Sequence, residues 1–346
     1  MTVHGGMTIT EKELHNLATR ALIGLGLSPI DAGDAARILV LGDLFGVHTH
    51  GVSRLESYGD RLEKGGIDAK AEIRMERVAP TIVKIDGGNG VGTLVGYRSL
   101  ESAMQMAREF GVGIVFARNS NHFGPIAPYS LIAAEAGFAS IIGSNSSTTI
   151  APTGGREAKL GNSPVAFAVP NPGGRPIILD MALSVVARAK IRDALKRGES
   201  IPDTWATDKQ GNATTDPKAA LDGFLLPIGG YKGYGLALIV DLFAGVLSGA
   251  AYLTRVSSWV DEPEAPQNLG HFFIVIDTRS LGPSAWLAER MNDFVEILHS
   301  TPAADPAKPV LVPGELELDR LERHRRDGVE MDAALLAKLE AYASRC

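Results

Sequence analysis

The sequence is almost free of cysteine: among its 346 residues the only one is Cys346, at the last position. A single cysteine excludes an internal disulfide and any metal site built on several cysteines. The cytosol keeps thiols reduced, whereas small secreted domains use disulfides. We therefore expect a cytoplasmic protein. Histidine, aspartate and glutamate are scattered without metal-ligand spacing, so we expect no metal site.

The sequence also lacks a basic excess and a long apolar run. It has 34 Lys and Arg against 40 Asp and Glu, a formal net charge of −6, and no basic stripe of the kind that indicates nucleic-acid binding. Its longest apolar run, residues 236–247, contains Asp241 and is too short to span a bilayer. The first ten residues show no signal-peptide pattern. We expect neither nucleic acid nor membrane as a partner.

A complete dinucleotide-binding fingerprint is missing as well. The glycine-rich residues 87–92 lie between a predicted strand over 81–85 and a predicted helix over 97–110, which is the order of a Rossmann site. Counted from Gly90-x-Gly92, however, the sixth position is Val95, and the next strand, 112–117, ends in Arg118 rather than in an acidic ribose ligand. These glycines fit a turn and a close helix contact equally well, and we reject an ordinary Rossmann site here.

What the chain does contain is enough apolar sequence for a large core, with a hydrophobic content of 45% that suits two domains. Thr10 and Glu13 form a capping box before the first helix, Ser28 precedes a second helix, and a third covers residues 53–64. The first seventy residues therefore predict an all-helical unit. Strand patterns begin at residue 81, and a charged helical region covers residues 317–344.

Residues 45–58 hold two imidazoles, a hydroxyl, a guanidinium and a phenol. His50 and Arg54 are four positions apart, so in a helix they would share one face. A neutral imidazole exchanges a proton near neutral pH, and a guanidinium binds a carboxylate through two parallel hydrogen bonds. The pair suits a small acid with a hydroxyl or carbonyl on the neighbouring carbon. Taken alone, it also fits the solvated start of a surface helix.

Further polar groups lie at the ends of predicted elements. His122 follows the strand over 112–117 and is either a second acid/base or a buried histidine in a turn. Asp180 ends an apolar strand, where it either caps the next helix or binds a ribose hydroxyl. Gly230 and Lys232 precede an apolar helix, and glycines, free amides and a lysine at a helix N-terminus attract phosphate. The small donors over 143–149 suit amide, ribose or phosphate oxygens.

In order along nearly the whole chain, several motifs resemble the type-2 malate/L-lactate dehydrogenase family, which also contains ureidoglycolate, sulfolactate and diketogulonate oxidoreductases and cyclic-imine carboxylate reductases. The motifs are Thr49-His50-Gly51-Val52 with Arg54, Asn121-His122-Phe123-Gly124, residues 161–170, Leu179-Asp180-Met181-Ala182, residues 232–238 and Pro313-Gly314-Glu315. The resemblance implies an α+β fold: a non-Rossmann cofactor domain around a mixed, largely antiparallel sheet, with a helical domain from both chain ends. We expect residues 1–75 plus 305–346 to form the helical domain and 76–304 the α/β cofactor- and substrate-binding region.

The resemblance also implies the roles of individual residues. It makes His50 and His122 catalytic and places Thr49 and Arg54 at the substrate. The cofactor, NAD or NADP, would lie along residues from several segments: Asn121, Ser146, Ser147, Asp180, Met181, Ala182, Gly230, Lys232, Pro313, Gly314 and Glu315. Members of the family dimerise, so the resemblance implies a homodimer that acts on a small-molecule carboxylate.

The chain departs from the family pattern at several positions. The family usually has serine at Thr49, an acidic residue at His48, glycine at Ala189 and Gly-Thr-Asn-Pro at residues 161–164. We expect an oxidoreductase that transfers a hydride between NAD(P) and a small 2-hydroxy or 2-oxo acid. The alternatives are a reductase of a cyclic imine carboxylate and a catalytically inactive metabolite-binding homologue. The neighbouring Arg54 favours His50 over His122 as the acid/base.

Overall fold

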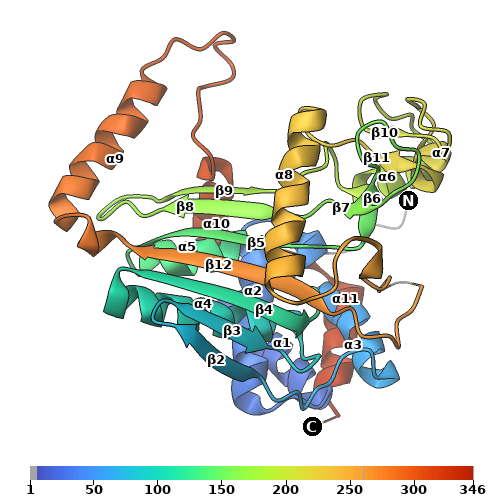
Figure 1. The fold of residues 1–346 in the computed structure, drawn as a ribbon, viewed down its shortest axis with the longest axis horizontal. Helices are drawn as coiled ribbons and strands as arrows, with labels where there is room; N and C mark the ends of the chain where they lie inside the picture. The colour runs from blue at the N-terminus through green and yellow to red at the C-terminus, as the bar shows by residue number, and fades with distance from the viewer. Residues whose placement is uncertain (1–5, 260, 346) are drawn as a thin grey trace.

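The computed structural model describes residues 6–259 and 261–345, so Cys346 lies outside the described residues. Its centre is a seven-stranded sheet in the order β2-β3-β4-β12-β5-β8-β9 (Figure 1). The strands are β2 (Arg74–Ala79), β3 (Ile82–Asp86), β4 (Val112–Ser120), β5 (Phe138–Ser144), β8 (Val165–Val169), β9 (Ile177–Met181) and β12 (Leu269–Asp277). Strands β3 and β4 are parallel, and the other neighbouring pairs of this sheet are antiparallel. The predicted mixed sheet is confirmed.

Helices cover both faces of this sheet. Successive side chains of a strand point to opposite faces, and in β12 Phe273 joins the main core while Phe272 joins a second apolar cluster. On the first face lie α4 (Gly92–Phe110) and α5 (Ala127–Glu135), with α2 (Pro29–Leu44) packed on them. Across the second face run α8 (Tyr231–Asp241) and the π-helical turn η2 (Leu242–Leu247).

Both ends of the chain meet beside α2. Helix α1 (Glu11–Gly24) packs on α2 and on α11 (Ala333–Ala343), and α10 (Glu315–Asp327) also packs on α2. The predicted capping box is confirmed, with Thr10 and Glu13 bonded in both directions. The all-helical prediction is wrong at the ends, because β1 (Gly6–Ile9) pairs with β13 (Val329–Asp332), which interrupts the predicted terminal helical region. A partner so distant in sequence leaves no local pattern.

A small lobe lies beyond one end of the large sheet (Figure 1). Its sheet has the order β10-β11-β6-β7, and α6 and α7 enclose a separate apolar cluster with it. The bounds are β6 (Thr148–Ile150), β7 (Leu160–Gly161), α6 (Arg188–Arg197), β10 (Ala206–Thr207), α7 (Pro217–Asp222) and β11 (Phe224–Leu225). The remaining elements are η1 (His48–His50), α3 (Arg54–Lys64), η3 (Leu253–Arg255), η4 (Thr278–Ser280) and α9 (Ser284–His299).

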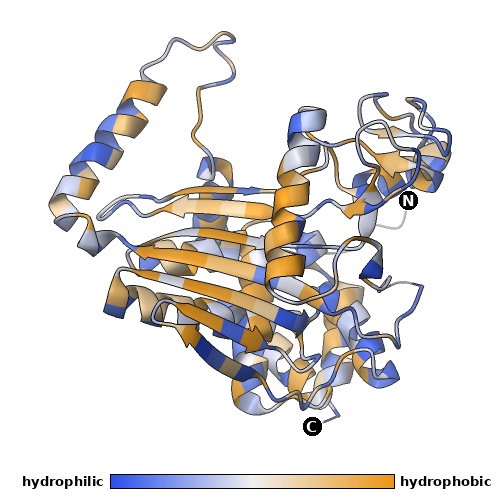
Figure 2. Ribbon diagram, in the orientation of Figure 1, coloured by the Kyte–Doolittle hydropathy of each residue, from blue (hydrophilic) through white to orange (hydrophobic). Residues whose placement is uncertain are grey.

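Helix α8 and η2 are hydrophobic over most of their length although they lie at the surface (Figure 2). Ala237 and Ala244 are buried against the sheet, but Leu236, Ile239 and Leu247 remain about half exposed. None of the helices within residues 6–259 and 261–345 is both long and apolar enough to cross a membrane.

Candidate active site

One face of α3 carries polar side chains to the loop that holds His122. Arg54, Tyr58 and Arg61 stand at helical positions i, i+4 and i+7, so they point to the same side of the helix. Tyr58 and Arg61 are each only 1% exposed. From this face Tyr58 contacts His122, and Arg61 contacts Asn121, the residue before it. The helix that follows η1 therefore holds the loop that follows β4.

The imidazole of His122 is fixed by Tyr58. Nδ1 of His122 lies 2.8 Å from the Tyr58 hydroxyl oxygen, and that hydroxyl donates a hydrogen bond of 2.9 Å to the His122 carbonyl oxygen. With the phenolic hydrogen used in this way, the ring binds the phenol by donating from Nδ1–H. The Gly124 amide N–H also points at Nδ1, at the longer distance of 3.4 Å. We assign the Nδ1 hydrogen from the shorter contact with Tyr58, because hydrogen bonds weaken with length. In this tautomer Nε2 carries the free lone pair, so His122 is arranged to accept a proton at Nε2.

The second imidazole, His50, lies beside the first. It ends η1 rather than standing on α3 itself, and its ring centroid is 5.4 Å from that of His122. Nδ1 of His50 lies 2.9 Å from Oγ1 of Thr49. The turn that carries both residues is held by the buried Asp43, which accepts a hydrogen bond of 2.7 Å from the Val52 amide. Thr49 and His50 are thus brought to one place with His122.

An aromatic side chain from a distant loop completes the cluster. The indole of Trp259 stacks on His122, with centroids 5.2 Å apart and planes inclined by 23°. The Cζ atom of Arg54 lies 4.7 Å from the centroid of the Trp259 ring, within the range of a cation–π contact. Three groups from separate parts of the chain therefore meet here.

The electrostatics of the cluster keep both imidazoles neutral. Burial, and then the charge of Arg54, lowers the pKa of His50 to about 4. Burial is also the main cause of the pKa of His122 lying well below its ordinary value, and Arg54 adds to it. A neutral imidazole is the form that accepts a proton. The cluster therefore offers proton acceptors beside a cation.

The guanidinium of Arg54 has an unused hydrogen-bond donor that suits an anion. Its Nε is buried without a hydrogen-bond partner, and a buried unpaired donor is costly. Burial, together with the nearby charge of Arg192, lowers the pKa of the Arg54 guanidinium. A carboxylate placed on Arg54 would supply the missing hydrogen bond and offset the charge.

The glycine-rich segment before α4 supports the histidine loop. A Cβ atom on Gly92 would lie 2.2 Å from the Asn121 carbonyl oxygen and 2.3 Å from that of His122, and one on Gly87 would lie 2.9 Å from the carbonyl oxygen of Asn119. Such distances leave no room for a side chain. These glycines therefore let two backbone segments of the protein pack closely together. A close contact of this kind is the alternative to a Rossmann site that the sequence left open.

The segments predicted to bind the cofactor are connected by hydrogen bonds. Ser146 Oγ donates to Asn162 Oδ1 at 2.9 Å. The Leu183 amide donates to the Asn162 carbonyl oxygen at 2.8 Å. The Ile228 amide in turn donates to the Leu183 carbonyl oxygen at 3.0 Å. This series of bonds brings three predicted segments side by side: Ser146 and Ser147; Asp180, Met181 and Ala182; Gly230 and Lys232.

The start of α8 is open. Lys232 is exposed there, and Gly229 and Gly230 adopt left-handed φ values of 57° and 64° with open space where a Cβ would be. Pro313 and Gly314 lie against β9, because the Ile178 amide donates to the Pro313 carbonyl oxygen at 3.2 Å. Glycine amides, a lysine and a helix N-terminus form a donor set for phosphate.

Like Ser146, three further predicted cofactor residues have partners within the protein. Asn121 is 1% exposed and bonds through its amide group to Arg61 and to Asn89. Glu315 lies 2.8 Å from His299 Nε2. Asp180 caps α5, since its Oδ2 accepts from the amides of residues 126 and 127 at 3.0 and 2.7 Å. The expectation that it caps the next helix is wrong, because α5 precedes it in the chain and only the fold brings the two together. Helix α5 follows the His122 loop, so this cap links the cofactor segments to the histidines.

The roles of Tyr58, Arg61 and Trp259 were not predicted from the sequence. The spacing of Tyr58 and Arg61 from Arg54 was visible as one helix face, and that signal could have assigned both side chains to the site. Trp259 reaches the cluster from a loop far along the chain from the other members, and no local pattern marks such a contact.

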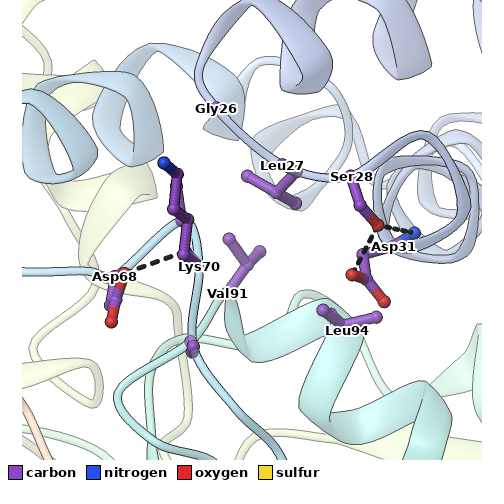
Figure 3. Close-up of a pocket in the computed structure, with 11 residues that line it drawn as sticks. Gly26, Leu27, Ser28, Asp31, Asp68, Lys70, Val91 and Leu94 are labelled. Carbon is purple, nitrogen blue, oxygen red and sulfur yellow. Dashed lines mark hydrogen bonds between the residues drawn. The ribbon is translucent and has the colours of Figure 1, made fainter.

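A separate cavity of about 410 Å³ lies between the start of α2 and the start of α4. Leu27, Val91 and Leu94 line its apolar part, with Asp68 and Lys70 on one side and Ser28 and Asp31 on the other (Figure 3). It shares no lining residue with the histidine cluster. Within residues 6–259 and 261–345, no group of three or more His, Cys, Asp or Glu is placed to hold a metal ion.

Comparison with known proteins places the chain among enzymes. A family model described as malate/L-lactate dehydrogenase matches residues 9–340. Malate dehydrogenase of Pyrococcus horikoshii is 37% identical over 97% of this chain and 95% of its own length. Ureidoglycolate dehydrogenase (NAD(+)) of Escherichia coli K12 is 35% identical over 94% and 93%, and (2R)-3-sulfolactate dehydrogenase (NADP(+)) of Chromohalobacter salexigens is 35% identical over 97% and 98%.

Solved structures agree with this result. The structure of the Pyrococcus horikoshii malate dehydrogenase has a TM-score of 0.86 at 35% identity and covers 98% of this chain and 95% of that one. The structure of delta1-piperideine-2-carboxylate reductase from Pseudomonas syringae has a TM-score of 0.87 at 30% identity and covers 97% and 99%. The resemblance inferred from the motifs is confirmed.

Proposed function

This chain belongs to the malate/L-lactate dehydrogenase family, and we propose that its active site is the cluster of His50, His122 and Arg54. It is an NAD(P)-dependent oxidoreductase of small 2-hydroxy and 2-oxo acids. One observation supports the placement of the site above all: a guanidinium whose buried Nε has no partner lies beside two neutral imidazoles. That arrangement fits a carboxylate whose neighbouring carbon bears a group that exchanges a proton.

The roles of the side chains follow from their surroundings. Arg54 holds the substrate carboxylate, and Nε2 of His122 takes the proton of the 2-hydroxyl group as the carbon–oxygen bond becomes a carbonyl. Tyr58 keeps the lone pair of His122 on Nε2. His50, with Thr49, orients the substrate oxygen. Because Tyr58 holds its ring, we place the proton transfer on His122 rather than on His50, which the sequence favoured.

The chain also offers groups that suit NAD(P). Bound NAD(P) would supply the redox chemistry, the exchange of a hydride with carbon 2 of the hydroxy or oxo acid. We propose that Lys232 and the Gly230 amide hold its phosphates at the open start of α8. The cofactor would lie along a set of residues from three segments: Ser146, Ser147, Met181, Ala182, Pro313 and Gly314. Asp180 would fix the position of its own segment by capping α5. Asn121 and Glu315 would act through the contacts that they already make.

A second candidate reaction is the reduction of a cyclic imine carboxylate. The similarity to delta1-piperideine-2-carboxylate reductase favours it, and Arg54 would hold the carboxylate in the same way. The deciding experiment measures NADH and NADPH oxidation with 2-oxo acids and with cyclic imine acids. Turnover of 2-oxo acids at the higher kcat/KM supports the first reaction, and higher kcat/KM for imine acids supports the second. Cofactor binding without any turnover would contradict both and favour an inactive homologue.

We further propose that the chain forms a homodimer in the cytoplasm, with a cofactor region of non-Rossmann type. The exposed apolar face of α8 and η2 supports the dimer, because large exposed apolar patches mark interaction surfaces. The near absence of cysteine supports the location. The division into a helical domain of residues 1–75 plus 305–346 and a region of 76–304 stays a prediction. Sedimentation that showed a fully active monomer would contradict the dimer.

A further inference from the structure

We infer that Trp259 is a specificity-determining residue: its indole is the wall against which the substituent on carbon 3 of the substrate packs, and it restricts the enzyme to small substituents. This inference rests on the proposed function, since it takes Arg54 and His122 as the two groups that hold the substrate. It names a residue of the loop before β12 that neither the motifs nor the proton-transfer chemistry requires.

The positions of Arg54 and His122 place the substrate beside the indole of Trp259. A substrate with its carboxylate on Arg54 and its oxygen on His122 must bridge two groups that each contact the same indole. The Trp259 centroid lies 5.2 Å from that of His122 and 4.7 Å from the Cζ atom of Arg54. The carbon chain between the two ends of the substrate therefore lies beside the indole. An aromatic surface there is apolar and rigid, so it favours a short hydrocarbon group and limits its size.

Residues 263–265, which follow Trp259 in the chain, are anchored to the rest of the protein. Arg61, which is almost fully buried, donates to the carbonyl oxygen of Ala265 at 2.8 Å and to Oδ1 of Asn121 at 3.2 Å. One guanidinium thus connects the Trp259 loop to the residue before His122. A Cβ atom on Gly66 would lie 2.0 Å from the Pro263 carbonyl oxygen, so the loop also packs directly on the chain just past α3.

Hydrogen bonds within the loop hold Trp259 in a turn. Ser258 Oγ donates to Oδ2 of Asp261 at 2.6 Å, and the Glu262 amide donates to the Ser258 carbonyl oxygen at 3.0 Å. A wall built on an anchored turn discriminates by size, because moving it aside requires breaking these hydrogen bonds and those of Arg61. Removing the indole itself is the direct way to enlarge the space.

The test compares kcat/KM for 2-oxo acids of increasing size, from pyruvate through 2-oxobutanoate and 4-methyl-2-oxopentanoate to phenylpyruvate, in the wild type and in Trp259→Ala. We expect the ratio of phenylpyruvate to pyruvate activity to rise about 10-fold or more in the variant, since one methylene group in an apolar pocket discriminates by about 10–200-fold. Trp259→Phe keeps a smaller aromatic wall and should give an intermediate ratio.

Trp286 is the matched control. It is an exposed tryptophan on α9 with the Cζ atom of Arg290 5.7 Å from its ring centroid, so it has a cationic neighbour but lies outside the histidine cluster. Trp286→Ala should leave the substrate ratio unchanged. An unchanged ratio in Trp259→Ala, with pyruvate still turned over, would overturn the inference and leave the proposed function intact.

A fluorescence measurement keeps the inference testable even if Trp259→Ala fails to fold or no oxo acid is turned over. In a Trp205→Phe, Trp286→Phe double variant Trp259 is the only tryptophan. Oxamate, an unreactive isostere of pyruvate, added with NADH or NADPH should change its emission. No turnover by the wild type would contradict the proposed function. No emission change at saturating oxamate, with binding shown by calorimetry, would contradict the place given to Trp259.

Discussion

Tyr58 contacts His122 twice, with its hydroxyl oxygen 2.8 Å from Nδ1 of the ring and 2.9 Å from the carbonyl oxygen of the same residue. One phenol therefore fixes the backbone and the side chain of the proposed proton acceptor together. Tyr58 is fully buried, and burial raises the pKa of its hydroxyl. It remains a protonated donor throughout the pH range in which the enzyme would work.

Tyr58→Phe should reduce both catalysis and stability. The ring of His122 loses its orienting partner, so kcat should fall by about 10- to 100-fold, the range typical of losing a partner that orients a ligating histidine. A buried polar group left unpaired costs about 1–3 kcal/mol, which thermal or urea unfolding would detect. Ser57→Ala, whose hydroxyl bonds to the Arg54 carbonyl oxygen, is the control. Wild-type kcat in Tyr58→Phe would contradict the orienting role.

Replacing the two histidines should separate their roles. His122→Asn removes the proposed proton acceptor, so kcat should fall by about 10²- to 10⁴-fold and its acidic pH limb should disappear. His50→Asn should mainly raise KM and keep the limb. Steady-state kinetics over a pH series that extends well below neutrality provide the measurement. The reverse result would return the acid/base role to His50, and unchanged profiles in both variants would exclude either histidine from proton transfer.

Removing the charge of Arg54 should change the titration of His50. Arg54 is the second cause, after burial, of the pKa of His50 lying at about 4 instead of 6.5. In Arg54→Gln this repulsion is lost, so the pKa should rise toward the ordinary value without reaching it, because burial remains. Histidine ring signals in an NMR titration report this shift directly. Oxamate binding to the wild type should raise the same pKa, since a carboxylate offsets the guanidinium. An unmoved pKa in both experiments would contradict the coupling.

His271 should make the protein sensitive to acid. It is fully buried between Ser144 and Ser120, at 2.9 and 2.8 Å, and burial lowers its pKa from 6.5 to about 3. In the unfolded chain His271 is therefore protonated below about pH 6.5, whereas in the folded chain it stays neutral down to about pH 3. The contribution of His271 to stability is fully present above about pH 6.5 and falls by about 1.4 kcal/mol per pH unit as the pH drops from there to about pH 3.

Urea unfolding at several pH values tests this expectation. His271→Gln removes the titrating group, so its free energy of unfolding should be lower than that of the wild type near neutrality but should decline less steeply toward acid. His15→Gln, which changes a part-exposed histidine bonded to the Gly33 carbonyl oxygen, is the control. Parallel slopes for the wild type and His271→Gln would contradict the assignment.

Gly92→Ala and Lys232→Ala should fail in opposite ways. A Cβ on Gly92 collides with the carbonyl oxygens of Asn121 and His122, so this variant should lose stability. Lys232 is exposed, so its variant should melt like the wild type but bind NADH and NADPH more weakly through loss of a phosphate contact. Melting curves measure the stability of the two variants, and nucleotide titrations measure their affinity for NADH and NADPH. A Gly92→Ala protein of wild-type stability that no longer bound nucleotide would restore the Rossmann interpretation.

How much could be predicted from the sequence depended on the distance between interacting residues. Thr10 and Glu13 lie within one turn, so their capping box was predicted and is confirmed. The family, and with it the reaction class, was predicted because several short motifs of the family occur in the same order along this chain. The contacts of Tyr58 with His122 and of Trp259 with both His122 and Arg54 join segments that only the fold brings together. Periodicity within a segment carries no information about such contacts.

The pairing of β1 with β13 has a consequence for biosynthesis. Ile9 pairs with Val329, so β1 has no partner on the ribosome until Val329 has been made, roughly 20 s to 1 min later at typical translation speeds. Helix α1 can pack on α2 early, but its other partner, α11, is made only at the end of synthesis. The apolar side chains of these early helices need protection during that interval. Growing chains should therefore bind chaperones through their N-terminal helices and release them only after α11 has emerged.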